Sequence, residues 1–244
     1  MDQKQMNLVG HLEELRKRII VILIAFVLAF VFSFIFVQDL YQFLVKDLDG
    51  KLALLGPGDI IRIYMMIAGV MAVAVTIPVA AYEIWKFVQP ALSREEQKLT
   101  LMYIPGLFFL FCAGIAFGYF ILFPLVLSFL SNLTGDLFQT FFTAEKYFTF
   151  MLNLVVPFGC LFEMPAVVMF LTRIGVLDPA KLIKSRKISY FLLIVVSILI
   201  TPPDFISDVL VIIPLLLLYE LSITLSKAVY RKRLSSKNAS PAAP

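Results

Sequence analysis

The sequence predicts an all-α integral membrane protein with six transmembrane helices. Hydrophobic residues make up 61% of the 244 positions and charged residues only 16%, whereas soluble domains are about 45–50% apolar and about 25% charged. The mean hydropathy is +0.93. The apolar residues also gather in six separate segments. Because lipid offers the backbone no hydrogen-bond partner, segments that cross a membrane in this way must be helical.

The six segments differ in length, and a crossing helix needs about 20 apolar residues. They cover residues 19–37, 63–82, 99–129, 148–171, 188–200 and 209–225. The third is too long for one simple crossing. The fifth, with 13 residues, reaches only about 20 Å of a hydrocarbon core of about 30 Å. The sixth is interrupted by Pro214 and Glu220. We therefore expect short fifth and sixth helices, which either thin the bilayer locally or are extended by Ser189, Tyr190 and Ser207.

Basic residues predict the orientation, since cytoplasmic segments are enriched in Lys and Arg. Seventeen of the 21 Lys and Arg residues lie at the two ends or between the second and third and the fourth and fifth segments. Six crossings place both ends on one side, so both termini are expected in the cytoplasm. We expect residues 1–230 to form a single six-helix domain and residues 231–244 a basic, disordered cytoplasmic tail.

The composition leaves little room for a metal, a cofactor or a disulfide framework. There is one His, and the two cysteines, Cys112 and Cys160, both fall in apolar segments. Such a set cannot build an ordinary zinc site. The net charge of +4 needs no nucleic-acid partner, because membrane orientation accounts for the basic residues.

Glu163 is an acidic residue in the middle of the fourth apolar segment. A charge at that depth costs about 2.5 kcal/mol or more to insert, so intramembrane carboxylates are usually functional. The alternative is a protonated glutamic acid that hydrogen-bonds to a neighbouring helix. Both interpretations remain open from the residues alone.

Two carboxylates on the cytoplasmic side form a second group of interest, Glu14 and Glu96. Apolar residues at positions 8, 12, 15 and 19 predict an amphipathic helix leading into the first span, and Glu14 lies on its polar face. Glu14 and Arg18 are spaced for a surface ion pair. Ser93 and Glu96 are spaced for a helix capping box. These structural roles are the alternatives to a binding site.

Several strings resemble the TatC family, the multispanning receptor of twin-arginine protein translocation. The first is His11-Leu-Glu-Glu14-Leu-Arg16-Lys-Arg18, followed by Tyr82-Glu-Ile-Trp85-Lys-Phe87-Val-Gln-Pro90-Ala-Leu92 and then Glu96. Two more are Phe158-Gly-Cys-Leu-Phe162-Glu163-Met-Pro165 and Leu199-Ile-Thr201-Pro-Pro-Asp204. They stand in the family's order, and the resemblance covers residues 8–230.

The resemblance implies a receptor that binds twin-arginine signal peptides at the cytoplasmic face of a bacterial-type cytoplasmic membrane. It further implies single-span TatA/TatB-type partners, a homo-oligomer within the complex, and export of folded proteins driven by the proton-motive force. Of the site residues, Glu14 and Glu96 would accept the peptide's arginines, Phe87 would add an apolar contact and Arg16 would orient the glutamates. Glu163 would contact a partner helix. Asp204 would act at the outer face, or simply cap the sixth helix.

Two other classes of protein compete with this interpretation. Gly56-Pro-Gly58-Asp59 spells the G-x-G-D string of membrane aspartyl proteases, but it lies between spans and no apolar segment holds a second aspartate. The sole histidine, His11, is outside the spans, so an intramembrane Ser-His pair is absent as well. We therefore expect no enzyme. The stronger alternative is a proton-coupled small-solute transporter that uses Glu163 as a proton relay.

Overall fold

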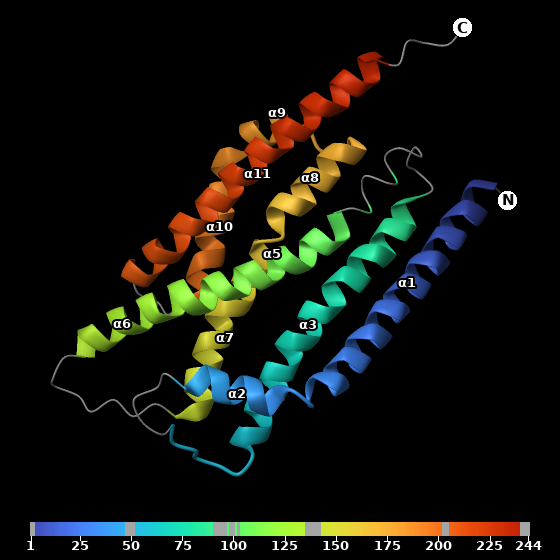
Figure 1. Cartoon of the computed structure of the whole chain (residues 1–244). Coiled ribbons are helices and arrows are strands. Elements are labelled where there is room, and N and C mark those ends of the chain that lie inside the picture. Colours follow the sequence, from blue (N-terminus) through green and yellow to red (C-terminus); the bar gives the residue numbers. More distant parts are fainter. Residues whose placement is uncertain are drawn as a thin grey trace, which may run out of the picture. The chain divides into compact units, whose positions relative to one another are not determined.

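A computed structural model describes residues 3–46, 52–89, 97, 101, 103–134, 143–201 and 205–239. The chain divides into two compact units, Met1–Phe108 with Phe141–Thr149, and Phe109–Thr140 with Phe150–Pro244. Both are built from helices (Figure 1). One isolated β-bridge joins Ala53 to Thr143. The all-α prediction is confirmed.

The first unit is organised around α1 (Gln3–Ser33), α2 (Val37–Val45) and α3 (Asp59–Val88). α1 and α3 pack side by side (Figure 1). The predicted first span continued to Val37, but the chain bends by 66° between α1 and α2. The hydroxyl of Ser33, the last residue of α1, donates to the carbonyl of Ala29. The backbone N–H groups of the next three residues, 34–36, bond to carbonyls three residues earlier, so the α-helix ends in a tighter turn. The predicted second span lies within α3.

The second unit contains α5 (Tyr103–Phe117) from Phe109 onward, the π-helical turn η2 (Gly118–Leu122) and α6 (Phe123–Thr134). These elements form one apolar run, Ile104–Asn132, longer than a simple crossing as the sequence predicted. The fourth span consists of α7 (Ala144–Leu161) and α8 (Met164–Ile174). A break at residues 162–163 separates them, immediately before Pro165, whereas Pro157 lies inside α7 without ending it.

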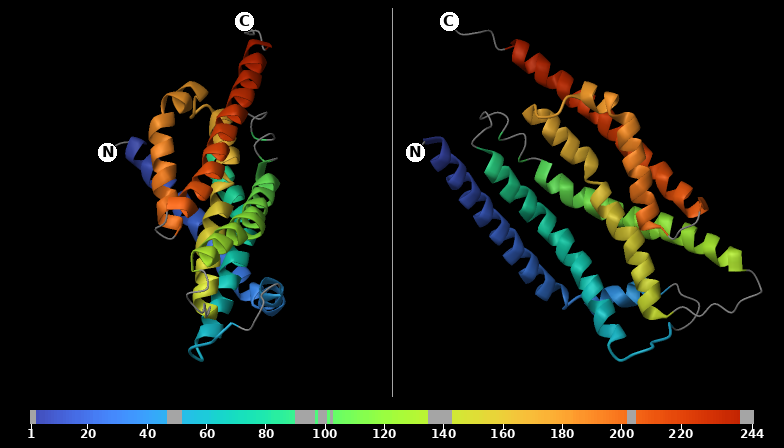
Figure 2. Two further views of the ribbon diagram at one scale, coloured as in Figure 1. Left: turned by 90° about the vertical axis from the view of Figure 1, so that its left-hand side faces the viewer. Right: turned by 180° about the vertical axis from the view of Figure 1, so that it is seen from behind.

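The last helices of this unit are α9 (Pro179–Lys184), α10 (Arg186–Ile200) and α11 (Phe205–Ala239). α11 packs along α8 and α10, as both views of Figure 2 show. At 15 residues, α10 confirms the short fifth helix. The prediction of a short, interrupted sixth helix is wrong, because α11 runs unbroken for 35 residues through Pro214 and Glu220. The end of α11 also makes residues 231–239 of the basic tail helical.

Glu220 lies inside α11, and both of its carboxylate oxygens accept a hydrogen bond from α10. Its Oε2 accepts a hydrogen bond from Nη2 of Arg186 at 2.7 Å, and its Oε1 accepts one from the Tyr190 hydroxyl at 2.5 Å. Pairing of this kind lowers the cost of a charged group in an apolar helix. Nearby, the hydroxyl groups of Thr172 and Ser226 lie 2.7 Å apart and join α8 to α11.

Four of the described helical segments are long and apolar enough to cross a membrane, and the bent pair of α1 and α2 makes a fifth. Together with α10, which corresponds to the fifth predicted segment, the described chain has six apolar helical segments. The 15 residues of α10 reach about 22 Å, less than the hydrocarbon thickness of about 30 Å. The six predicted apolar segments therefore all correspond to helices.

Candidate functional site

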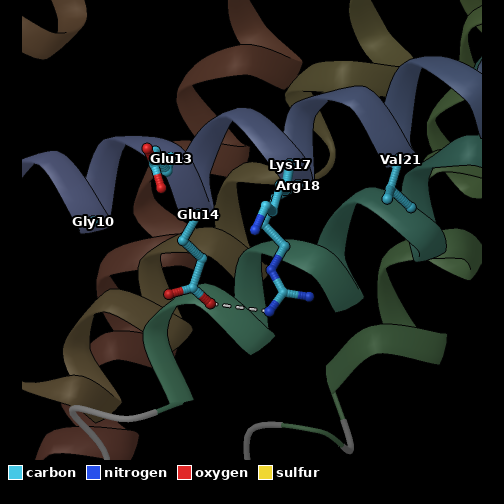
Figure 3. A pocket seen from close by; sticks show the side chains of 6 residues that line it. All are labelled: Gly10, Glu13, Glu14, Lys17, Arg18 and Val21. Atoms are coloured by element: carbon cyan, nitrogen blue, oxygen red, sulfur yellow. Dashed lines mark hydrogen bonds and ion pairs between the residues drawn. The ribbon is translucent and has the colours of Figure 1, made fainter.

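Glu14 lies on a face of α1 that borders a cavity of about 430 Å³. The lining residues are Gly10, Glu13, Glu14, Lys17, Arg18 and Val21 (Figure 3). Their spacing of three or four residues is that of one helix face. The Glu14 side chain is 37% exposed, so it remains accessible to a ligand that enters from this side. The cavity thus offers carboxylates and basic groups together at its wall.

Arg18 links Glu14 to a second carboxylate on the neighbouring helix. Its Nη2 donates to Oε1 of Glu14 at 3.0 Å, and its Nη1 donates to Oε2 of Glu83 at 2.8 Å. Figure 3 shows the first of these contacts within α1. The second joins α1 to α3, and the Glu83 side chain is only 8% exposed. The predicted ion pair between Glu14 and Arg18 is therefore present, but it belongs to a larger cluster.

The other predicted peptide-binding residues lie in different places. Arg16 is exposed on α1, and the contact to Glu14 comes from Arg18. Phe87 is half-buried in the last turn of α3, one turn beyond Glu83. Glu96 lies outside the described residues. Sequence reasoning missed Glu83, although a carboxylate directly after the second apolar segment was a signal that could have identified it.

Glu163 lies at the break between α7 and α8, where it is the residue before the first turn of α8. Both carboxyl oxygens are buried, and neither has a hydrogen bond of ordinary geometry among the described residues. Its side chain also does not cap α8. Burying a polar group without a hydrogen bond is costly. The backbone of Phe111 in α5 lies close enough to act on this carboxylate, but no hydrogen bond of ordinary geometry satisfies it among the described residues.

Within the second unit, the backbones of α5 and α7 approach each other closely just before Glu163. A Cβ atom added to Gly114 in α5 would lie 2.6 Å from the carbonyl oxygen of Phe158 and 2.8 Å from the Cβ of Phe162. On the α7 side, a Cβ added to Gly159 would meet the Phe111 ring at 2.8 Å. The ring of Phe117 lies 5.5 Å from that of Phe162. Tight packing therefore fixes the backbone immediately before Glu163.

Asp204, which the sequence predicted to act at the outer face or to cap the sixth helix, lies outside the described residues. The described carboxylate nearby is Asp208, in the first turn of α11. Its side chain accepts a hydrogen bond from the Thr201 hydroxyl, and its carbonyl accepts one from the Ser197 hydroxyl at 3.2 Å. These bonds tie the end of α10 to the start of α11.

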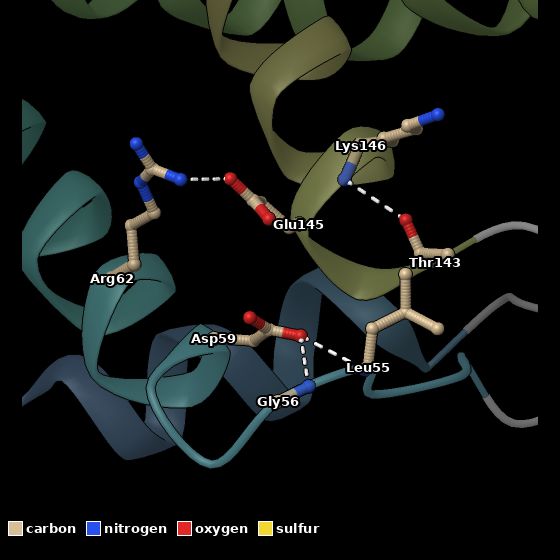
Figure 4. A network of polar contacts seen from close by, with 7 residues as sticks. All are labelled: Leu55, Gly56, Asp59, Arg62, Thr143, Glu145 and Lys146. Atoms are coloured by element: carbon tan, nitrogen blue, oxygen red, sulfur yellow. Dashed lines mark hydrogen bonds and ion pairs between the residues drawn. The ribbon is translucent and has the colours of Figure 1, made fainter.

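Asp59 of the G-x-G-D string has a structural role in the first unit (Figure 4). Its Oδ2 accepts hydrogen bonds from the backbone N–H groups of Leu55 and Gly56, both at 2.9 Å. The carboxylate thereby orders the turn that leads into α3. Arg62, one turn later, forms an ion pair with Glu145 of α7 (Figure 4). Asp59 therefore stabilises a turn, and the G-x-G-D string does not support the protease interpretation.

A family model for the Sec-independent protein translocase protein (TatC) matches residues 10–214. Among curated proteins, the chain is 64% identical to the Sec-independent protein translocase protein TatCd of Bacillus subtilis, over 99% of this chain and 100% of that protein. It is 42% identical to TatCy of the same organism, over 98% of this chain and 96% of the relative.

Solved structures agree with the sequence comparisons. A crystal structure of the twin-arginine translocase receptor TatC superposes with a TM-score of 0.78 at 36% identity, covering 90% of this chain and 99% of that one. The bacterial relatives and the apolar helices place the protein in a bacterial inner membrane. This match also removes the basis for the solute-transporter alternative. The chain belongs to the TatC family, whose members are membrane subunits of a Sec-independent protein translocase rather than enzymes.

Proposed function

We propose that the chain is the receptor subunit of a twin-arginine translocase and binds twin-arginine signal peptides at the cytoplasmic face. The observation that carries the proposal is the position of Glu14. It is partly exposed on a cavity-lining face of α1, within the string that resembles the family's N-terminal signature. A ligand with two guanidinium groups suits such a site, because Arg presents forked donors that match carboxylate oxygens.

Glu14 and Glu96 are the proposed acceptors of the two peptide arginines. Arg16 would orient these glutamates from the exposed side of α1. Phe87, in the last turn of α3, would supply an apolar contact next to the arginine pair. A lysine lacks the planar fork of arginine, so a twin-lysine peptide should bind more weakly.

Glu163 is proposed to contact a single-span partner of the TatA/TatB type. Its unsatisfied carboxyl oxygens suit a partner helix that brings a hydrogen-bond donor into the membrane. Pairing would remove the cost of leaving a buried polar group alone. Such an assembly, with several copies of this chain, would export folded proteins by using the proton-motive force. Asp204 is proposed to act at the outer face.

The receptor role is tested by crosslinking a labelled twin-arginine peptide to the full chain in membranes. Glu14→Ala and Glu96→Ala should each abolish the crosslink while the protein remains inserted, because each removes a guanidinium acceptor. Glu145→Ala is a matched control, since Glu145 pairs with Arg62 of α3 and is not one of the proposed acceptors. A twin-lysine peptide should crosslink weakly to all variants. Wild-type crosslinking in both acceptor variants would refute the receptor role.

A further inference from the structure

We propose that Glu83 retains Arg18 when a signal-peptide arginine binds, so that this internal guanidinium gives up Glu14 instead of competing with the peptide for it. The inference rests on the proposed role of Glu14 and adds a positioning residue to it. It starts from three charged side chains, Glu14, Arg18 and Glu83, which bridge α1 and α3; Figure 3 shows the pair on α1.

Arg18 uses a different nitrogen for each carboxylate. Nη1 donates to Glu83 at 2.8 Å and Nη2 donates to Glu14 at 3.0 Å. Without a peptide, Glu14 therefore already carries the kind of group that it is proposed to receive. Because the nitrogens are separate, Arg18 can release Glu14 and keep Glu83. A peptide guanidinium can then take the vacated place on Glu14.

The two contacts of Arg18 are unequal in strength. The pair with Glu14 is an i,i+4 contact on a partly exposed helix face, where the Glu14 side chain is 37% exposed. Pairs of this kind are weak because water screens them and side-chain freedom opposes them. The Glu83 side chain is only 8% exposed, and breaking a buried pair leaves an uncompensated charge. Competition by a peptide should therefore displace Arg18 from Glu14 and not from Glu83.

Glu83 also neutralises Arg18 next to the proposed peptide site. A bare guanidinium on α1 would repel the two arginines of the peptide, and it would swing fully onto Glu14. With Glu83 in place, the charge of Arg18 is balanced from the α3 side. The cavity wall then keeps Glu14 available as an acceptor. A purely structural tie between α1 and α3 would have no such consequence for peptide discrimination.

The test measures equilibrium binding of a fluorescent twin-arginine peptide to the purified full chain, with a twin-lysine peptide as reference. Glu83→Gln preserves the side-chain shape and should weaken binding by about two- to fivefold, since Arg18 then competes for Glu14 with the strength of a partly exposed ion pair. Arg18→Gln should bind at least as tightly as wild type, because the competitor is gone while the amide can still donate to Glu83. The double variant should bind within about twofold of Arg18→Gln.

The matched control is the double variant Arg62→Gln/Glu145→Gln, which removes another ion pair between helices of the first unit. It should leave peptide binding unchanged. The inference is overturned if Glu83→Gln binds like wild type, if Arg18→Gln loses binding to the same degree as Glu83→Gln, or if the control loses it equally. Should Glu83→Gln fail to fold, Arg18→Gln and the double variant still test the inference. Weaker peptide binding by Arg18→Gln than by the wild type would then overturn it. A wild-type chain that does not discriminate between the peptides refutes the proposed function and this inference together.

Discussion

Gly114→Ala tests whether the close approach of α5 and α7 is essential to the second unit. The new Cβ would lie 2.6 Å from the Phe158 carbonyl oxygen, 2.8 Å from the Gly159 Cα and 2.8 Å from the Phe162 Cβ. Two of these atoms belong to the backbone, so a rotamer change cannot relieve the contact. The helices must separate instead.

Overpacking of this kind costs about 1–3 kcal/mol, which lowers the ratio of folded to unfolded protein by roughly 5- to 150-fold. For a soluble chain of similar length the same loss lowers Tm by about 2–12 °C, and we expect a decrease in that range for the detergent-solubilised protein. Thermal unfolding followed by gel filtration measures it.

Gly106→Ala is the matched control, because Gly106 lies in the same helix and an added Cβ meets nothing within 4 Å. Alanine is the better helix former, so this variant should be as stable as wild type or slightly more stable. A Gly114→Ala protein with the Tm of the Gly106→Ala control would refute the argument that the glycine is needed for backbone contact.

Two further predictions concern assembly and orientation. Glu163→Ala should spare peptide binding but lower the amount of TatA/TatB-type partner that copurifies with the chain, because the proposed contact lies inside the membrane; unchanged partner stoichiometry would remove this role. For orientation, Asp2→Cys and Ser240→Cys, each in a background without Cys112 and Cys160, should react with a membrane-impermeant maleimide only from the cytoplasmic side. Labelling of the two positions from opposite sides would mean an odd number of crossings.

Glu163 and Glu83 show which site residues can be predicted from the sequence and which cannot. The sequence alone identifies Glu163, because a carboxylate in the middle of a long apolar segment is visible from local composition and is costly to insert. Glu83 follows directly on an apolar segment and looked like an ordinary boundary residue. Its importance comes from Arg18, which is 65 positions away in the chain. Local patterns cannot reveal such a pairing, because it depends on how two helices are rotated against each other.

The sequence by itself determined the six apolar segments, the all-α class and the family, since hydrophobic transfer to lipid and a few diagnostic strings are properties of composition and order. Tertiary structure alone decided the bend after Ser33, the continuity of α11 through Glu220, the backbone contact at Gly114 and the sharing of Arg18 between Glu14 and Glu83. These features arise from contacts between helices. They depend on distances of a few ångströms that no spacing within one helix can specify.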